Sequence, residues 1–220
     1  EVQPKARIEI AYADFSSLEE IRRMAKDIQT RFPRLDILLN NAGVYMTTRE
    51  LSKDGIEMTF AVNHLAPFLL TNLLGPLLKH DAEARVVNVS SVAHTRAPLD
   101  WENLQGEKSF DPYSAYATSK LCNVLFSNEL ARRCGDTKIT SNSLHPGVIN
   151  TKLLKIGFGG GGIPVEQGAE TTFFVCTSPK LNGLSGRYYS DSKEARPNPL
   201  ALINDNAHRL WELSKKLTTL

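Results

Sequence analysis

Tyr116 and Lys120 are the side chains whose types and spacing most directly suggest chemistry in this 220-residue sequence. They lie four residues apart in a run with helical apolar spacing, which predicts a helix of about five turns with both side chains on one face. A phenol normally loses its proton near pH 10, and a neighbouring ammonium favours the charged form. A tyrosine tuned in this way can exchange a proton with a substrate oxygen near neutral pH. The alternative is a solvated lysine beside a half-buried tyrosine, because so short a motif also arises by chance.

Charge and composition argue against several classes of function. The chain has 26 basic and 24 acidic side chains and no cluster of Lys and Arg longer than a pair, so we expect no nucleic-acid partner. No apolar run reaches the ~18 residues of a membrane span, so none is expected in this chain. The five His lack the spacing of metal ligands, and no metal site is predicted. With 41% hydrophobic residues, the chain is expected to form one domain, residues 1–220.

Cysteine usage bears on the compartment. The chain has three cysteines, Cys122, Cys134 and Cys176, and they form no CxxC motif. Their number and spacing favour a reducing compartment, so we expect a cytoplasmic protein.

Apolar periodicity and turn residues predict alternating strands and helices. Strands are expected at 7–13, 36–40, 85–91, 139–144 and 187–189, and helices at about 17–32, 55–78, 115–132, 165–176 and 200–217. The strand at 36–40 is almost wholly apolar, as expected for a strand buried on both faces of a parallel sheet. Pro67 is expected to bend the second helix. The alternation predicts an α/β fold with a doubly wound parallel sheet of the Rossmann type.

Polar or turn-forming residues stand at the ends of four predicted strands. They are Asp14, Asn40 with Asn41, Ser91, and Pro146 with Gly147. Ligands of doubly wound sheets bind beyond the carboxyl ends of the strands, so these four segments are predicted to converge on one site. Ordinary turn chemistry is the alternative for Asp14 or Asn41 taken alone.

In their order and spacing these residues resemble the short-chain dehydrogenase/reductase family. The resemblance covers the whole chain and is carried by Asp14, Asn40-Asn41-Ala42-Gly43, Asn63, Ser91, Tyr116 with Lys120, and Pro146-Gly147 with Thr151. It implies an oxidoreductase that transfers a hydride between NAD or NADP and a carbonyl or alcohol substrate. The implied catalytic tetrad is Asn63, Ser91, Tyr116 and Lys120.

The resemblance also assigns roles within the site. Tyr116 is implied to donate a proton to the substrate oxygen that Ser91 polarises. Lys120 is implied to bind the nicotinamide ribose and to lower the pKa of the tyrosine, while Asn63 supports a water linked to the lysine. The implied cofactor contacts are Asp14 and Phe15 at the adenine, Asn40, Ala42 and Gly43 at the adenosine ribose, and Pro146, Gly147, Val148 and Thr151 towards the nicotinamide, with Tyr116 and Lys120.

Within the family, the chain is similar to the retinol-dehydrogenase-like branch. The similarity rests on Asn63-His64-Leu65, His145-Pro146-Gly147 and an insertion at 94–113. It implies a small-molecule carbonyl or alcohol substrate that is apolar and retinoid-like, an aldehyde or ketone, and the family's long helices suggest a homodimer. In the insertion, Leu99, Trp101 and Phe110 either line the substrate pocket or pack the insertion onto the body. A nucleotide-sensing or scaffolding protein that keeps the fold stays open as an alternative function.

The sequence departs from the family at its beginning. The family's first strand, glycine-rich turn and helix have no counterpart, so we expect a fragment that lacks strands 1 and 2 and the residues that select NAD or NADP. The strand predicted at 7–13 would then lie without a neighbour. The segment 157–162 satisfies G-x-G-x-x-G but follows no buried strand. We therefore expect it to form a flexible flap at the substrate mouth rather than a phosphate site.

Overall fold

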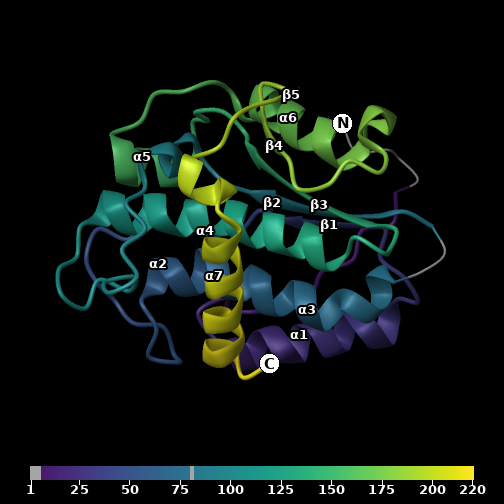
Figure 1. The fold of residues 1–220 in the computed structure, drawn as a ribbon, viewed down its shortest axis with the longest axis horizontal. Coiled ribbons are helices and arrows are strands. Elements are labelled where there is room, and N and C mark those ends of the chain that lie inside the picture. The colour runs from purple at the N-terminus through teal and green to yellow at the C-terminus, as the bar shows by residue number, and fades with distance from the viewer. Residues whose placement is uncertain (1–5, 80–81) are drawn as a thin grey trace.

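A mixed, mainly parallel sheet forms the centre of the protein (Figure 1). The computed structural model describes residues 6–79 and 82–220. Five strands follow one another in the order β1-β2-β3-β4-β5, and only the last pairing, β4 with β5, is antiparallel. Their bounds are β1 (Ile37–Asn40), β2 (Ala84–Val89), β3 (Ile139–His145), β4 (Tyr188–Ser190) and β5 (Lys193–Glu194). The predicted α/β class is therefore confirmed.

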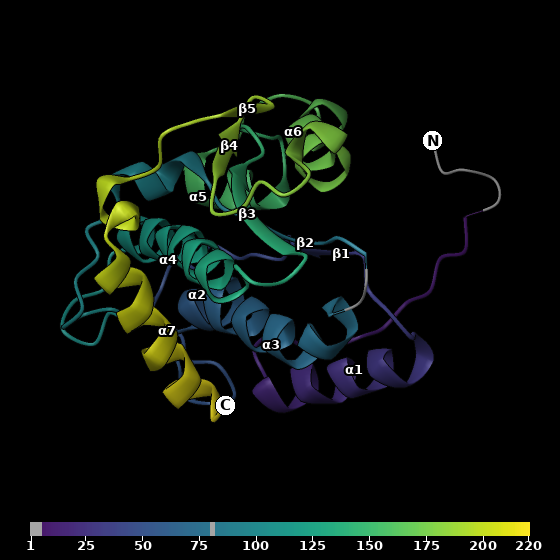
Figure 2. The same cartoon turned by 45° about the vertical axis from the view of Figure 1, so that its right-hand side comes forward.

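Helices cover both faces of this sheet. They are α1 (Leu18–Arg31), α2 (Met58–Phe60), α3 (Ala66–Leu78), α4 (Pro112–Arg133), α5 (Lys152–Phe158), α6 (Val165–Thr177) and α7 (Asn204–Thr218), with short helical turns η1 (Ala61–Leu65), η2 (Val92–Arg96), η3 (Pro179–Leu181) and η4 (Pro199–Leu202). On one face α3 and α4 pack against the strands, with α1 outside α3 and α7 outside α4 (Figure 2). On the opposite face α6 packs against β2, β3 and β4.

Local sequence explains where α4 begins and which way it faces. The Asp111 carboxylate caps the helix by accepting a hydrogen bond from the Ser114 N–H at 2.8 Å, and Pro112 occupies the first turn, where no N–H is needed. The buried face then carries polar as well as apolar side chains, among them Tyr116 and Lys120. Because this face packs against β2 and β3, both side chains are directed into the interior.

The predicted helix at 55–78 is irregular at Asn63. It starts at Met58, because the Glu57 carboxylate caps it by accepting from the Thr59 and Phe60 N–H groups at 2.8 and 2.7 Å. The π-helical turn η1 links α2 to α3. Pro67 has no N–H to offer the Asn63 carbonyl four residues earlier, which favours a wider turn at this point. The stretch Met58–Leu78 is long and apolar enough to span a membrane, but 78% of its most apolar window is buried, as in a core helix.

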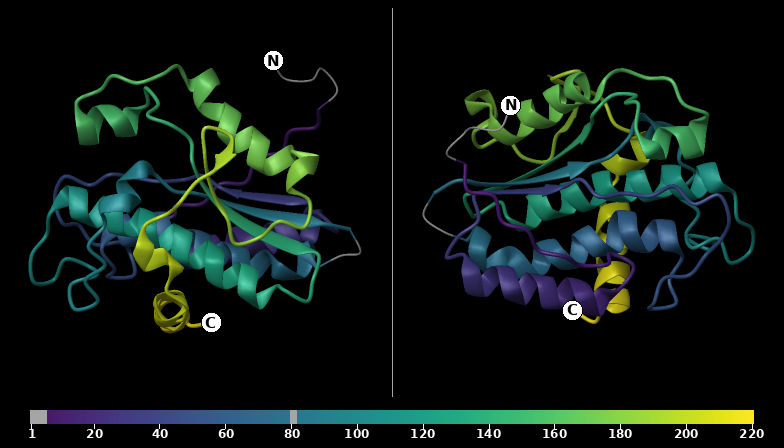
Figure 3. Two further views of the ribbon diagram at one scale, coloured as in Figure 1. Left: turned by 45° about the horizontal axis from the view of Figure 1, so that its top comes forward. Right: turned by 180° about the vertical axis from the view of Figure 1, so that it is seen from behind.

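Two expectations on the β1 side of the sheet are wrong. Residues 6–14 form no strand, and Figure 3 shows them leading into α1 as a plain trace. Ile8, Ile10 and Tyr12 are 68%, 64% and 82% exposed, because no described strand lies beside this segment to pair with it. The strand at 36–40 is not buried on both faces either. Alternate β1 side chains, Ile37 and Leu39, are 38% and 39% exposed, since α6 packs chiefly over β2 to β4.

Candidate active site

A cavity of about 700 Å³ opens at the carboxyl ends of β1, β2 and β3. Three of the four segments predicted to converge contribute to its wall. The sequence-predicted residues in the lining are Asn41, Ala42, Gly43, Ser91, Tyr116, Lys120, Pro146, Gly147, Val148 and Thr151. The parallel register of the strands brings these segments together, although up to about 110 residues separate them in the chain.

Tyr116 and Ser91 form the part of the wall that can transfer a proton. Tyr116 is 6% exposed, and its burial raises the pKa of the phenol while a side-chain hydrogen bond with Ser91 lowers it. Burial has the larger effect, so the pKa of the phenol is raised and not lowered as was expected. The consequence is a phenol that keeps its proton at neutral pH. A hydrogen bond that lowers this pKa is donated to the phenol oxygen, so the Ser91 hydroxyl is the donor, while its Oγ accepts from the Ala93 N–H at 3.2 Å.

Lys120 lies deeper in the same wall. It is 3% exposed, its Nζ donates to the Val89 carbonyl at 3.1 Å, and it stands 5.7 Å from the centre of the Tyr116 ring. Burial lowers the pKa of this ammonium to about 8. The Val89 carbonyl accounts for one of its three N–H groups. A ligand hydroxyl in the cavity would find two further donors there.

Asn63 does not line the cavity, but its side chain hydrogen-bonds to the loop after β1 and to α4, the helix that carries Lys120. Its Oδ1 accepts from the Val44 N–H at 2.7 Å, and its Nδ2 donates to the Val44 carbonyl at 3.0 Å and to the Ser119 Oγ at 2.9 Å. The loop after β1 is thereby tied to α4. A Cβ on Gly43 would stand 3.2 Å from the Lys120 Nζ, so the glycine lets the backbone pass close to the ammonium.

The remaining predicted residues lie outside the lining of this cavity. The Asp14 carboxylate accepts from the Ser16 N–H and hydroxyl at 2.9 and 2.7 Å and pairs with Lys53, which lowers its pKa to about 2. Phe15 packs against the core beside α1. The Asn40 Nδ2 donates to Thr71 and Asn88 side chains, so this residue ties β1 to α3 and β2.

Aromatic and aliphatic residues that the sequence had not singled out complete the cavity. Phe158 lies at the end of α5, with ring centres 5.4 Å from Tyr45, 6.2 Å from Tyr113 and 6.0 Å from Tyr116. Leu153 and Leu154 line the cavity from α5, and Val92 lines it from η2. Tyr113 was recognisable in principle, because it precedes Tyr116 by one helical turn. The others depend on how α5 folds back, and no spacing signal marks them.

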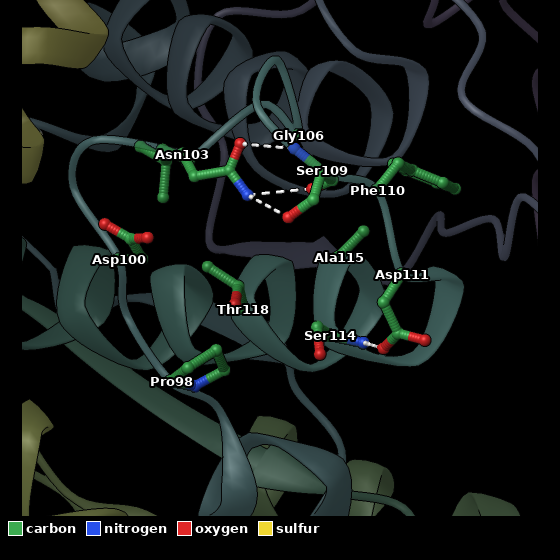
Figure 4. A pocket seen from close by; sticks show the side chains of 11 residues that line it. Pro98, Asp100, Asn103, Gly106, Ser109, Phe110, Asp111, Ser114, Ala115 and Thr118 are labelled. Atoms are coloured by element: carbon green, nitrogen blue, oxygen red, sulfur yellow. Dashed lines mark hydrogen bonds between the residues drawn. The ribbon is translucent and has the colours of Figure 1, made fainter.

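A second, smaller pocket of about 60 Å³ lies between the insertion and α4 (Figure 4). Asn103 closes this loop by hydrogen bonds to the Ser109 carbonyl and the Lys108 N–H, both at 2.8 Å. Phe110 lines this pocket, while Leu99 is buried and Trp101 lies under the Arg209 guanidinium. None of these three lines the larger cavity. The insertion residues thus pack the loop onto the body, which was one of the two alternatives.

The large cavity suits the nicotinamide end of a dinucleotide. The observation that supports this is the buried ammonium of Lys120, which has donors to spare behind a glycine that a Cβ would crowd. The turn that contains Ala42 and residues of the loop from Pro146 to Thr151 also line this cavity. Among residues 6–79 and 82–220, no group of three or more His, Cys, Asp or Glu side chains could hold a metal ion.

Comparison with known proteins points in the same direction. The model of the short chain dehydrogenase family matches residues 1–156. The chain is 38% identical to human retinol dehydrogenase 14 over 94% of its length and 66% of the relative's. It is 37% identical to the chloroplastic short-chain dehydrogenase TIC 32 B of Brassica napus, over 99% of this chain and 74% of that protein. The chain thus spans about two thirds to three quarters of the length of these relatives.

Solved structures share the fold. An uncharacterised protein from Mycobacterium paratuberculosis superposes with a TM-score of 0.76 at 28% identity, over 94% of this chain and 74% of that one. The NADPH-bound carbonyl reductase from chicken fatty liver superposes with a TM-score of 0.60 at 21% identity, over 80% and 71% of the two chains. At that identity the second match supports the fold alone.

Proposed function

The chain belongs to the short-chain dehydrogenase/reductase family, and we propose that it transfers a hydride between NAD or NADP and an apolar carbonyl or alcohol. The proposal rests on the arrangement of three side chains in the cavity wall. The Ser91 hydroxyl, the Tyr116 phenol and the Lys120 ammonium share one wall of a cavity large enough for a substrate and a nicotinamide. Asn63 is the fourth member of the proposed tetrad. It hydrogen-bonds to Val44 and Ser119 and so ties the loop after β1 to α4.

The residues act on the substrate oxygen and on the cofactor ribose. A bound nicotinamide supplies or accepts the hydride at the substrate carbon. Tyr116, kept neutral by burial, donates its proton to the oxygen on which charge develops during reduction. The Ser91 hydroxyl donates to the same oxygen and holds it in place. Lys120 binds the ribose hydroxyls with its unused N–H groups.

The proposed cofactor contacts follow the position of each residue. Ala42 and Gly43 flank Lys120 from the β1 side, and Pro146, Gly147, Val148 and Thr151 flank it from the β3 side. For Asp14, Phe15 and Asn40 the proposal rests on the family pattern and places them towards the adenosine. Either NAD or NADP fits this arrangement.

The chemistry of the cavity lining favours an apolar substrate. Val92, Leu153, Leu154 and Phe158 are apolar residues of the cavity lining, and several relatives are named retinol dehydrogenases. An apolar aldehyde, ketone or alcohol buries its chain against these groups while its oxygen meets Ser91 and Tyr116. We therefore propose a retinoid-like or other long-chain apolar substrate.

Cofactor titration provides the test. Purified protein is titrated with NADPH and with NADH while the nicotinamide fluorescence is followed, and oxidation of the cofactor is then measured with retinaldehyde. We expect saturable binding of at least one cofactor and aldehyde-dependent oxidation. Absence of binding would contradict the proposal, whereas binding without turnover over a panel of apolar aldehydes and ketones would favour the nucleotide-sensing or scaffolding alternative.

Assembly and location form a finer part of the proposal. The family pattern supports a homodimer, and the free thiols of Cys122, Cys134 and Cys176 suit a reducing compartment such as the cytoplasm. Light scattering after size exclusion checks the first expectation, with twice the chain mass as the predicted result. Fractionation of cells that express the tagged protein checks the second, and enrichment in a membrane or organelle fraction would contradict it.

A further inference from the structure

The carbonyl of Ser91 is held by two nitrogen atoms of one buried residue, His94. The His94 backbone N–H donates to it at 3.1 Å, and the His94 Nδ1 lies 2.6 Å from it. The other ring nitrogen, Nε2, accepts a hydrogen bond from the Asn198 N–H at 3.2 Å and therefore carries no proton. The single proton of the neutral ring must be on Nδ1, so this nitrogen donates to the Ser91 carbonyl.

Asn198 secures the same turn from the C-terminal part of the chain. It is 5% exposed and lies in the segment between β5 and η4, which returns beside α4 in Figure 1. Its Nδ2 donates to the His94 carbonyl at 2.9 Å, and its Oδ1 accepts from the Leu200 N–H at 2.9 Å. The ring of Tyr188 on β4 packs against the imidazole with 4.7 Å between ring centres. His94 is thereby fixed from two sides.

These contacts restrict the orientation of the Ser91 side chain. Ser91 has an extended backbone, with φ −157° and ψ 156°, and its Oγ accepts from the Ala93 N–H. With its carbonyl held by His94 and its Oγ held by Ala93, the serine has little freedom to turn its hydroxyl away from Tyr116. Loss of the imidazole removes the shorter of the two hydrogen bonds to this carbonyl and leaves the backbone N–H of residue 94 as its only donor among the described residues.

We propose that His94 and Asn198 are positioning residues that aim the Ser91 hydroxyl at the substrate oxygen. The kinetic part of this inference rests on the proposed function. Neither residue lines the cavity, so neither touches the reacting atoms. The inference extends the machinery of the site to the C-terminal segment, which lies more than 100 residues beyond Ser91 in sequence.

Amide hydrogen exchange tests the positioning without any need for activity. His94→Phe keeps an aromatic ring against Tyr188 but loses both ring hydrogen bonds, whereas His94→Asn places an amide nitrogen near the position of Nδ1 and keeps the donor. Exchange at the Ala93 and His94-position N–H groups should accelerate at least tenfold in His94→Phe and less than threefold in His94→Asn. Thr95→Ala is the matched control, because the Thr95 hydroxyl bonds only to the Val92 carbonyl on the exposed side of the same turn. Unchanged exchange in His94→Phe would overturn the proposal.

Kinetics of a double-mutant cycle separate positioning from general structural damage. In the native background, His94→Phe should lower kcat for carbonyl reduction about tenfold and leave the dissociation constant of the dinucleotide within twofold, because Lys120 is untouched. In the Ser91→Ala background the same substitution should change kcat less than twofold, since there is no hydroxyl left to aim. Equal losses in both backgrounds would refute the positioning role.

Two further outcomes keep the inference separate from the proposed function. If His94→Phe does not fold, Asn198→Ala replaces it in both measurements; it removes the Nδ2 donor to the His94 carbonyl, so changes in the same direction are expected and their absence would contradict the proposal. If the native protein reduces no carbonyl but the exchange rates change as stated, the hold on Ser91 stands and the proposed function fails. If the native protein is active and the exchange rates are unchanged, the proposed function stands and the positioning role of His94 fails.

Discussion

The two sides of the sheet's carboxyl edge satisfy their polar groups in different ways. Around β2, β3 and α4, the side chains of Asn63, His94 and Lys120 are at most 3% exposed, and each hydrogen-bonds to a backbone carbonyl. On the β1 side, Ile37 and Leu39 are partly exposed, and the Asp14 carboxylate bonds only to nearby exposed groups. The groups proposed for proton transfer thus stand among buried hydrogen-bond partners, while the carboxylate proposed for the adenine end is held by partners that are open to solvent.

This difference predicts how substitutions rank. Substitutions around β2, β3 and α4 should alter turnover strongly, because the side chains there are buried and each is held by its own hydrogen-bond partners. Changes on the β1 side should alter cofactor affinity slightly and turnover little. The following substitutions test the ranking from the largest expected effect downwards.

Tyr116→Phe should lower kcat for carbonyl reduction by at least ~10²-fold, the usual scale of a general acid. The phenyl ring keeps its contacts with Tyr45 and Phe158, so the dissociation constant for the dinucleotide should change less than threefold. Steady-state kinetics and nicotinamide fluorescence measure the two quantities. Tyr113→Phe, on the same helix and in the same cavity, is the matched control and should lower kcat less than tenfold. Turnover within tenfold of native in Tyr116→Phe would remove the tyrosine from its assigned role.

Lys120→Met should weaken dinucleotide binding at least tenfold and at the same time stabilise the fold. The ammonium is desolvated, and its carbonyl partner keeps a second donor, because the Asn123 Nδ2 donates to the same Val89 oxygen at 3.2 Å. Removing the buried cation should raise the free energy of unfolding at pH 7 by about 1–3 kcal/mol, since each tenfold loss of proton affinity on folding corresponds to about 1.4 kcal/mol. Urea denaturation measures the gain, and Lys53→Met, at an exposed lysine, should show none.

The same substitution has a defined pH dependence. The folded-state pKa of Lys120, about 8, lies below its ordinary value of 10.5, so the unfolded chain binds more protons between these two pH values. The native protein therefore carries the full penalty below pH 8 and regains that stability as the pH rises towards 10.5. The stabilisation by Met should shrink accordingly between pH 7 and pH 10. A gain that stays constant over this range would show that the lysine is not the cause.

The region around β2, β3 and α4 is also where the sequence was most informative. Tyr116 and Lys120 share a face because four residues separate them, and Ser91 and Gly147 follow the ends of strands whose apolar runs mark them clearly. The irregular turn at Asn63, the tautomer of His94 and the approach of Phe158 to the tyrosines depend on contacts between distant segments. Spacing along the chain carries no signal for these features.

The β1 side shows where sequence patterns mislead. Alternation at 7–13 resembles a strand, but alternation specifies only which side chains share a face and does not supply a neighbouring strand. The apolar run at 36–40 likewise indicates two apolar faces without showing what covers them. In the structure, small side chains such as Ala11 and Ala13 pack against the core, while Ile8 and Ile10 remain outside.

Asp14→Asn should have the smallest effect. The substitution removes the carboxylate charge that pairs with Lys53, while an amide oxygen can still accept from the Ser16 N–H. We expect a change of about two- to fivefold in the dissociation constant of the dinucleotide and no change in kcat, because the residue lies outside the cavity lining. Asp27→Asn, on the outer face of α1, is the control. A tenfold loss of kcat in Asp14→Asn would contradict the ranking of the two sides.

Transfer of deuterium from the cofactor to the substrate tests the central claim most directly. Protein in excess is mixed with dinucleotide carrying deuterium at C4 of the reduced nicotinamide, as both NADPH and NADH and in both stereochemical forms, together with an apolar aldehyde. Mass spectrometry of the alcohol should show one deuterium at the carbinol carbon for one of the labelled cofactors, and Tyr116→Phe should form this product at least ~10²-fold more slowly. Alcohol without deuterium, or labelled alcohol formed equally fast by Tyr116→Phe, would contradict the account.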